Sequence, residues 1–278
     1  MADERAGKAY ERMQIDLSGR TALVTGSTAG IGFATARQLA ECGARVVVNG
    51  RTKQRVNDAV DALRSVLGDR SGALEGTAAD VGTADGVAEL TERWPDVDVL
   101  VNNAAAFALT PFEQISDEAW QQYWDLNVMS GVRLARHHVP RMVSRGWGRV
   151  VFVSSESGLH IPPEMVHYGV TKAAVIAAAR GIAESYPASG VTVNSVLPGP
   201  TRSEGFMQMM QNTAKEQGVS VEQAERDMSA TARPTSLLGR AATPDEVANM
   251  IVYVCSPQAS ATVGAALRVD GGVVRAIP

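Results

Sequence analysis

The sequence predicts an α/β protein built on one doubly wound parallel sheet of about seven strands, with helices on both faces. Two observations predict this. Short apolar runs, typical of strands that are buried on both faces, alternate along the chain with longer helical patterns. In addition, the first apolar run leads directly into a glycine-rich segment that precedes a helical pattern, which is how a nucleotide-binding α/β domain begins.

The elements follow in order along the chain. Strands are expected at Thr21–Thr25, Arg45–Asn49, Ala73–Ala79, Val97–Asn102, Arg149–Ser154, Val191–Val196 and Ala266–Val269. Helices are expected at Ile31–Cys42, Lys53–Leu67, Asp85–Trp94, Asp117–Ser144, Tyr168–Tyr186 and Pro244–Cys255. Ser116 and Thr243 are the expected N-caps of two of these helices, since acidic residues follow each of them.

Composition excludes several classes of protein. The chain has 278 residues, of which 45% are hydrophobic and 20% charged, as in a soluble globular domain. A net charge of -4 gives no reason to expect nucleic acid or an anionic membrane as a partner. Cys42 and Cys255 lie far apart in apolar patterns, so we expect core packing and no metal site.

The two ends of the chain differ in character. Residues 1–14 are polar and charged and contain no apolar core of a secretory signal, so we expect a mobile N-terminal extension. Residues 15–278 are expected to form a single domain. The sequence contains no run of about twenty apolar residues, so we expect no membrane span. We expect a cytoplasmic protein.

The glycine-rich segment has a specific physical role. It reads Thr25-Gly26-Ser27-Thr28-Ala29-Gly30-Ile31-Gly32 and connects a strand to a helix. Glycines at such a turn permit a tight bend and a close approach of the backbone to a ligand. The helix that follows directs its free N–H groups and its positive dipole end at a phosphate. We therefore expect Ser27 and Thr28 to offer hydroxyls, and Ile31 a backbone N–H, to a pyrophosphate.

A second group of residues carries acid–base chemistry. Tyr168 and Lys172 are four residues apart, so a helix places them on one face. A nearby ammonium lowers the pKa of a phenol from its usual value near ~10. Ser155 stands thirteen residues before Tyr168, at the end of the fifth expected strand.

Together these residues resemble the short-chain dehydrogenase/reductase family, and more narrowly its 3-oxoacyl-carrier-protein-reductase-like members. The glycine segment has the family's TGxxxGxG form, and Ser155, Tyr168 and Lys172 have its spacing. Further matches are Asp80-Val81, Asn102-Asn103-Ala104, Asn127 and Pro198-Gly199, so that the resemblance covers roughly residues 15–274. It implies a Rossmann-type NAD(P)-binding domain and hydride transfer between a nicotinamide and a carbonyl or secondary alcohol.

The resemblance also implies residue roles. Tyr168 exchanges a proton with the substrate oxygen, Ser155 orients that oxygen, Lys172 serves the tyrosine and the nicotinamide ribose, and Asn127 holds a water in the proton relay. Asp80 and Val81 are expected at the adenine ring, with a helix N-cap as the alternative role for Asp80. The cofactor-binding set is Gly26, Ser27, Thr28, Gly30, Ile31, Gly32, Arg51, Asp80, Val81, Asn103, Ala104, Tyr168, Lys172, Pro198, Gly199 and Thr201.

The end of the second strand bears on the choice of cofactor. Gly50 occupies the position at which NAD-binding relatives carry an acidic residue, and Arg51 follows it. A guanidinium can bind two oxygens of a 2′-phosphate at once. Ala29 argues the other way, because many NADP-using relatives place a basic residue there. We expect NADP(H), with NAD(H) left open.

The segment of residues 202–233 is expected to be a lid over the substrate, or alternatively a permanently packed helical pair. The expected pocket wall is mainly apolar and consists of Ala106, Phe107, His160, Ile161, Pro162, Met165, Gly199, Phe206 and Met207. Glu156 and Glu164 either contact a polar part of the substrate or face water. The resemblance implies a small-molecule alcohol or ketone substrate and a homotetramer or homodimer. The alternative to an enzyme is an NADP(H)-binding sensor or scaffold.

Overall fold

A computed structural model describes residues 14–68 and 73–277, and its centre is a seven-stranded sheet. All neighbouring strands run parallel, in the order β3-β2-β1-β4-β5-β6-β7. The strands are β1 (Thr21–Val24), β2 (Arg45–Gly50), β3 (Leu74–Ala78), β4 (Val99–Asn102), β5 (Gly148–Val153), β6 (Val191–Pro198) and β7 (Ala266–Val269). The predicted fold class is therefore confirmed, whereas the predicted N-terminal extension lies outside the described residues except for Gln14.

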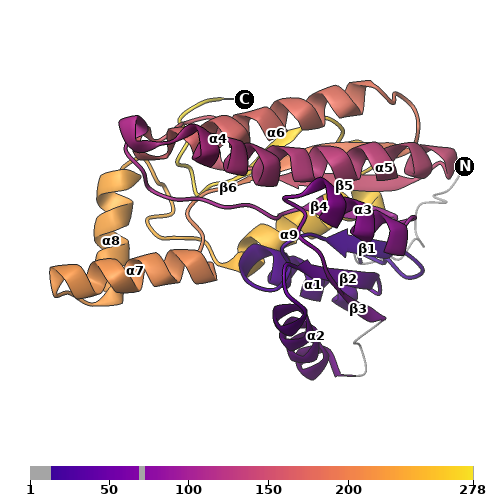
Figure 1. Cartoon of the computed structure of the whole chain (residues 1–278), viewed down its shortest axis with the longest axis horizontal. Helices are drawn as coiled ribbons and strands as arrows, with labels where there is room; N and C mark the ends of the chain where they lie inside the picture. Colours follow the sequence, from indigo (N-terminus) through magenta and orange to yellow (C-terminus); the bar gives the residue numbers. More distant parts are fainter. Residues whose placement is uncertain (1–13, 69–72, 278) are drawn as a thin grey trace, which may run out of the picture.

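Helices cover both faces of the sheet (Figure 1). They are α1 (Gly30–Glu41), α2 (Lys53–Leu67), α3 (Ala84–Arg93), α4 (Asp117–Trp124), α5 (Ser130–Ser144), α6 (Val166–Glu184), α7 (Glu204–Gln217), α8 (Val221–Ala232) and α9 (Pro244–Cys255). One core lies between the sheet and α1, α2 and α9, and the other lies between the sheet and α3, α5 and α6. No helix in the described ranges is long and apolar enough to cross a membrane.

Both predicted N-caps are present. The Ser116 hydroxyl accepts a hydrogen bond from the Ala119 N–H at 3.2 Å. The Thr243 hydroxyl accepts one from the Glu246 N–H at 3.2 Å, and the Glu246 carboxylate accepts one from the Thr243 N–H at 2.8 Å. These reciprocal bonds satisfy amide groups that the first turn of a helix leaves free. Cys255 is fully buried in the core, as expected, whereas Cys42 is half-buried just after α1.

The long helix predicted over residues 117–144 is interrupted. A π-helical turn at Asp125–Met129 separates α4 from α5. Its Asn127 side chain accepts a hydrogen bond from the Ala106 N–H at 2.9 Å and donates to the Ala106 carbonyl at 3.1 Å and to the Thr171 hydroxyl at 3.0 Å. The wider turn directs this side chain inward, and π-turns of this kind occur often at functional sites.

Two helices project from the carboxyl-terminal edge of the sheet (Figure 1). They are α7 and α8, which occupy most of the predicted lid segment, residues 202–233. Ser203 and Ser220 cap them. Phe206 and Met210 of α7 pack with Ala241 in a small apolar cluster of their own, separate from the two main cores. The segment therefore has little shared core with the sheet, which is typical of regions with low local stability.

Candidate active site

A cavity of about 640 Å³ lies where the carboxyl ends of β1, β4, β5 and β6 meet the two projecting helices. In open α/β sheets, ligands bind outside this edge, where the strand order reverses. Here the reversal falls between β1 and β4. The cavity volume lies within the usual range of small-molecule sites.

The glycine turn borders this cavity through Ala29, Gly30 and Ile31. Gly26 and Gly30 have positive φ angles of 61° and 57°, which side chains disfavour. A Cβ atom on Gly32 would lie 2.5 Å from the Asn103 side-chain nitrogen and 2.5 Å from the Gly26 carbonyl. Asn103 occupies that space and donates to the carbonyls of Thr25 and Gly26 at 2.9 and 3.1 Å. Asn103 thus holds the turn in shape.

The N-terminus of α1 is free to bind an anion. Its N-cap residue, Ala29, supplies no side-chain hydrogen bond, in contrast to the capped α2, α3, α4, α7, α8 and α9. Ala29, Gly30 and Ile31 all line the cavity. Amide groups that point unpaired into a cavity from a helix N-terminus are suited to a pyrophosphate.

The hydroxyls expected at the pyrophosphate differ in their surroundings. The Ser27 hydroxyl is fully buried; it donates to the Val24 carbonyl at 2.7 Å and accepts from the Asn49 N–H at 3.0 Å. Its side chain therefore joins β1 to β2. The Ser27 N–H donates to the Asn49 carbonyl at 2.9 Å, and the residue does not border the cavity that the described residues form. Thr28 is half-buried and its methyl group lies against Gly50, where a Cβ atom would approach it to 2.5 Å.

Steric crowding explains why Gly50, and not an acidic residue, stands at the end of β2. Any side chain at Gly50 would collide with Thr28 and would lie 3.2 Å from a methyl group of Val56. Arg51, the next residue, is exposed. Within the described part of the chain its guanidinium forms no ion pair, so its charge is available to a ligand at this edge.

Asp80 and Val81 follow β3. The Asp80 carboxylate is exposed and accepts from the Gly82 N–H at 3.0 Å. The N-cap of α3 is Thr83, so the alternative role of Asp80 as a helix cap is wrong. Val81 is buried in the core on the α3 side of the sheet. After β4, the half-buried Ala104 donates its N–H to the Thr25 hydroxyl at 3.0 Å.

The sixth strand ends in a tight turn. A Cβ atom on Gly199 would lie 2.7 Å from the Asp270 carbonyl, so only glycine fits there. The Thr201 hydroxyl donates to the Gly199 carbonyl at 2.9 Å. Pro198, Gly199 and Thr201 all border the cavity.

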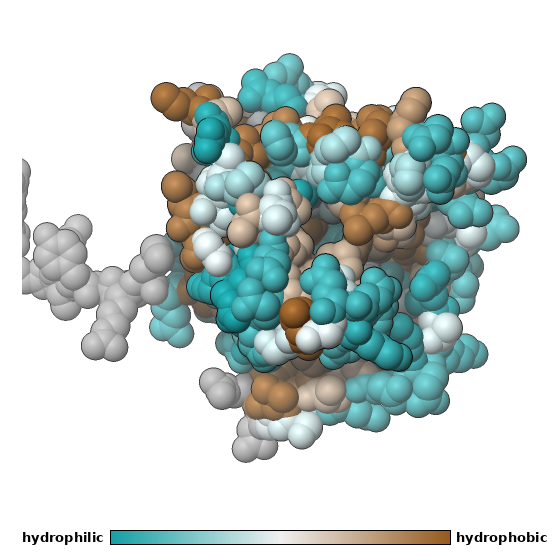
Figure 2. Space-filling model, turned by 90° about the vertical axis from the view of Figure 1, so that its left-hand side faces the viewer, coloured by the Kyte–Doolittle hydropathy of each residue, from teal (hydrophilic) through white to brown (hydrophobic). Residues whose placement is uncertain are grey.

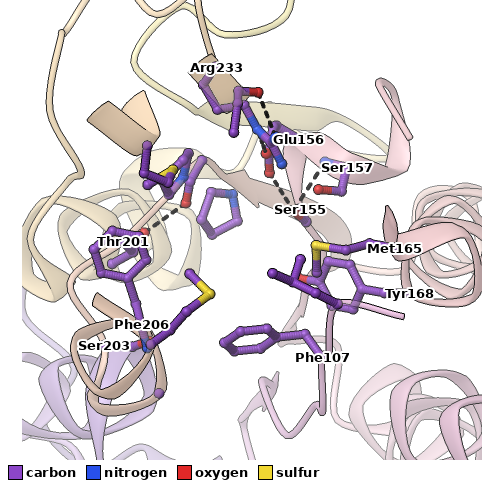
Figure 3. Close-up of a pocket in the computed structure, with 18 of the residues that line it drawn as sticks. Phe107, Ser155, Glu156, Ser157, Met165, Tyr168, Thr201, Ser203, Phe206 and Arg233 are labelled. Carbon is purple, nitrogen blue, oxygen red and sulfur yellow. Dashed lines mark hydrogen bonds and ion pairs between the residues drawn. The ribbon is translucent and has the colours of Figure 1, made fainter. Parts of the chain in front are cut away.

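Of the predicted acid–base residues, Ser155 and Tyr168 face the cavity (Figure 3), and Lys172 also borders it. Tyr168 and Lys172 come from the first half of α6, and the Lys172 nitrogen lies 5.6 Å from the centre of the tyrosine ring. Ser155 follows β5 and faces the cavity. The neighbouring Ser154 is buried and donates to the Lys172 carbonyl at 2.7 Å, which joins β5 to α6.

The two titratable groups lie in an apolar environment. Burial lowers the pKa of Lys172 to about 8, and its ammonium donates to the Val153 carbonyl at 2.8 Å. Burial also raises the pKa of Tyr168; the Glu156 carboxylate acts in the same direction and the Arg233 guanidinium in the opposite one. In this arrangement Tyr168 holds its proton at neutral pH, and Lys172 is poised near the physiological range.

Sequence reasoning missed one buried pair. Glu156 is neither exposed nor free, because Arg233, just after α8, donates from Nε to its Oε1 atom at 2.9 Å. The other oxygen of Glu156 accepts from the Ser155 hydroxyl at 2.5 Å (Figure 3). Glu156 and Arg233 are 77 residues apart in the chain, and no local pattern in the sequence predicts their contact.

The cavity wall away from the glycine turn is mostly apolar. Of the predicted wall residues, Phe107, Met165, Gly199 and Phe206 border the cavity, and so does Glu164. Ala106, His160, Ile161, Pro162 and Met207 do not border the cavity that the described residues form. Further side chains of α7 and α8 border the cavity, among them Met209, Met210, Thr213, Asp227 and Met228. Figure 2 shows this end of the molecule, where hydrophilic side chains surround patches of hydrophobic ones.

Known proteins share both the sequence pattern and the fold. A family model described as enoyl-(acyl carrier protein) reductase matches residues 26–274. The chain belongs to the short-chain dehydrogenase/reductase family. It is 41% identical to the uncharacterized oxidoreductase YvaG of Bacillus subtilis, over 95% of this chain and all of the relative. It is 31% identical to a D-beta-hydroxybutyrate dehydrogenase of Rhizobium meliloti, over 91% and 98% of the two chains.

A solved structure supports the same conclusion. The L-sorbose reductase of Gluconobacter frateurii, determined with NADPH and L-sorbose, superposes with a TM-score of 0.89 at 31% identity, over 95% of this chain and all of the other. The family resemblance predicted from the sequence is thereby confirmed. The protein is an oxidoreductase of this family.

Proposed function

We propose that this protein is an NADP(H)-dependent oxidoreductase that interconverts a ketone and a secondary alcohol. The observation that carries the proposal is the convergence of Ser155, Tyr168 and Lys172 on one cavity that an uncapped helix N-terminus after the glycine turn also borders. The helix N-terminus fits a dinucleotide pyrophosphate, and the three side chains fit acid–base chemistry.

The residues present fit an NADP(H) cofactor. The free amides of Gly30 and Ile31 would hold the pyrophosphate, and Arg51 would pair with a 2′-phosphate at the end of β2, where Gly50 leaves no carboxylate to repel it. Solved relatives with NADPH support the same choice. Asp80 and Val81 would meet the adenine, and Lys172 the nicotinamide ribose.

The chemistry then divides between the cofactor and the chain. The nicotinamide supplies or accepts the hydride. Tyr168 gives its proton to the carbonyl oxygen during reduction and takes it back during oxidation. Ser155 orients the same oxygen. Lys172, with a pKa of about 8, stabilises the phenolate that remains after proton transfer.

Asn127 has a positioning role in this scheme. Its three hydrogen bonds to Ala106 and Thr171 connect the loop after β4 to α6, one residue before Lys172. The relay water expected at Asn127 stays a prediction. The side chain as placed fixes the distance between the cofactor side of the cavity and the acid–base side.

The proposal is tested by measuring the absorbance of the nicotinamide band during turnover. Purified protein is mixed with NADPH or NADH and a panel of neutral ketones, 3-oxoacyl thioesters and keto sugars. We expect NADPH-dependent turnover of at least one class and none with Tyr168→Phe. Tight NADPH binding without turnover of any panel member would favour the alternative, a sensor or scaffold.

A further inference from the structure

A short chain of polar contacts connects α8 to Ser155. Arg233 is the residue that ends α8, and its Nε donates to Glu156 at 2.9 Å. Glu156 in turn accepts the Ser155 hydroxyl proton at 2.5 Å. Figure 3 shows the three side chains in line above the cavity, with Tyr168 below them. A segment predicted to cover the substrate therefore has a direct link to a residue that is expected to touch it.

The pair is buried, which makes the link energetically significant. The side chains of Glu156 and Arg233 are only 4% and 11% exposed. Surface ion pairs contribute little, but a buried pair that loses one partner leaves an uncompensated charge in a medium of low dielectric. Other ion pairs of α7 and α8 are more exposed: Arg55–Glu204, at 2.8 Å, has side chains 56% and 67% exposed.

Ser155 has one proton to donate. In this structure it donates that proton to Glu156, while its oxygen accepts from the Ser157 N–H at 3.1 Å. To stabilise a substrate carbonyl oxygen, the hydroxyl must turn its proton from Glu156 toward the substrate. Glu156 thus competes with the substrate for the proton. Arg233 shares the carboxylate charge and weakens this competition.

We propose that Glu156 and Arg233 are positioning residues, through which the seating of α8 sets the direction in which Ser155 donates its proton. The inference rests on the proposed carbonyl chemistry. With Arg233 seated, Glu156 holds the hydroxyl in place but can release its proton to a substrate oxygen. With Arg233 withdrawn, the unpaired carboxylate keeps the proton. Substrate activation is therefore coupled to closure of α8.

The pair also acts on Tyr168 through its charges, which provides a readout. The Glu156 carboxylate raises the tyrosine pKa and the Arg233 guanidinium lowers it. The other titratable groups that face Tyr168 are Tyr123 from α4 and Lys172 from α6. Removing one member of the pair should therefore shift the tyrosine titration in one direction, and removing the other should shift it in the opposite direction.

The test uses the full chain and four variants: Glu156→Gln, Arg233→Met, Arg233→Lys and, as matched control, Arg55→Met. Arg55 also joins the body of the protein to the projecting helices, but through α7 and without contact to Ser155. The ratio kcat/KM for alcohol oxidation is measured against pH with saturating NADP. We expect the limb that reports Tyr168 to move to higher pH in Arg233→Met and to lower pH in Glu156→Gln.

The fall in kcat of Arg233→Met, and its recovery in Arg233→Lys, distinguish a positioning role from a general loss of structure. Losing a hydrogen bond to a charged group changes a rate or equilibrium constant by roughly ten-fold or more. We therefore expect kcat of Arg233→Met to fall by about that factor. KM for the cofactor should change less than about two-fold, since the pair contacts only the substrate side. Arg233→Lys retains the charge and should recover most of the wild-type pH profile. Shifts of the same sign in Glu156→Gln and Arg233→Met, or an equal shift in Arg55→Met, would overturn the proposal.

A second measurement does not depend on turnover. Amide hydrogen exchange over residues 221–232 should be faster in Glu156→Gln and Arg233→Met than in the wild type and in Arg55→Met, because the buried pair holds the end of α8. Wild-type exchange in both variants would refute the link. If the wild type reduces no carbonyl compound but the exchange result is obtained, the proposed function fails while the link between α8 and Glu156 stands.

Discussion

Lys172→Met should make the protein more stable at neutral pH while it abolishes turnover. Lys172 is 3% exposed, and its ammonium has one hydrogen-bond acceptor among the described residues, the Val153 carbonyl at 2.8 Å. Burial lowers the pKa of this side chain from 10.5 to about 8. The ammonium is therefore less stable in the folded protein than in water. It lies 5.6 Å from the centre of the Tyr168 ring.

The magnitude follows from the pKa. At about 1.4 kcal/mol for each pH unit, the lowering corresponds to about 3 kcal/mol of destabilisation wherever the folded lysine is charged. Methionine has a similar length and no charge, so it removes this term and keeps the packing. Loss of the hydrogen bond to Val153 offsets about 1 kcal/mol. We expect Lys172→Met to unfold with a free energy about 2 kcal/mol higher than the wild type at pH 7.

The pH dependence has a definite sign. The folded pKa lies below the unfolded one, so between pH 8 and about 10.5 the unfolded wild type binds one more proton than the folded form. The stability of the wild type should therefore rise with pH over this window relative to Lys172→Met. The advantage of the variant is full below pH 8 and disappears as the pH approaches 10.5.

The assay is urea unfolding of cofactor-free protein at several pH values between 6.5 and 9.5, followed by fluorescence at one fixed protein concentration. Turnover of the same samples with NADPH is measured in parallel. A variant that is less stable than the wild type at pH 7, or a difference that does not vary with pH, would refute the account of Lys172 as a buried charge with a lowered pKa.

Four further outcomes test the remaining proposals. Tyr168→Phe should lower kcat by about 10²–10⁴-fold and leave NADPH affinity nearly unchanged; retention of a tenth of wild-type turnover in a chemistry-limited assay would contradict its role. Arg51→Ala should reduce the ratio of kcat/KM for NADPH to that for NADH by roughly ten-fold to a hundred-fold or more, whereas an unchanged ratio would make Arg51 a surface charge. Light scattering at micromolar concentration should show a homotetramer or homodimer, and a monomer would contradict this. Amide exchange over residues 202–233 should slow when NADPH and a slow substrate bind; equal and strong protection with and without ligands would mean a permanently packed helical pair.

The fold was predictable because its signals are local. Most strands are short apolar runs, and the boundaries of β7, α2 and α9 match the prediction to the residue. Caps such as Thr243 depend on neighbours a few residues away. The π-turn around Asn127 was not predictable, because its cause lies in partners at Ala106 and Thr171 that only the folded chain brings within reach.

The sequence by itself determined the family, the sheet, the strand end that Ser155 follows and the helix that carries Tyr168 and Lys172, because periodicity and spacing are properties of the chain. Only the tertiary structure decided what surrounds them. The burial that lowers the pKa of Lys172 is the sum of contacts from many segments. The meeting of Glu156 with Arg233, across 77 residues, depends on where the fold brings the end of α8 relative to the segment after β5. Such contacts arise from the packing of whole elements, and a linear pattern of residue types does not record that packing.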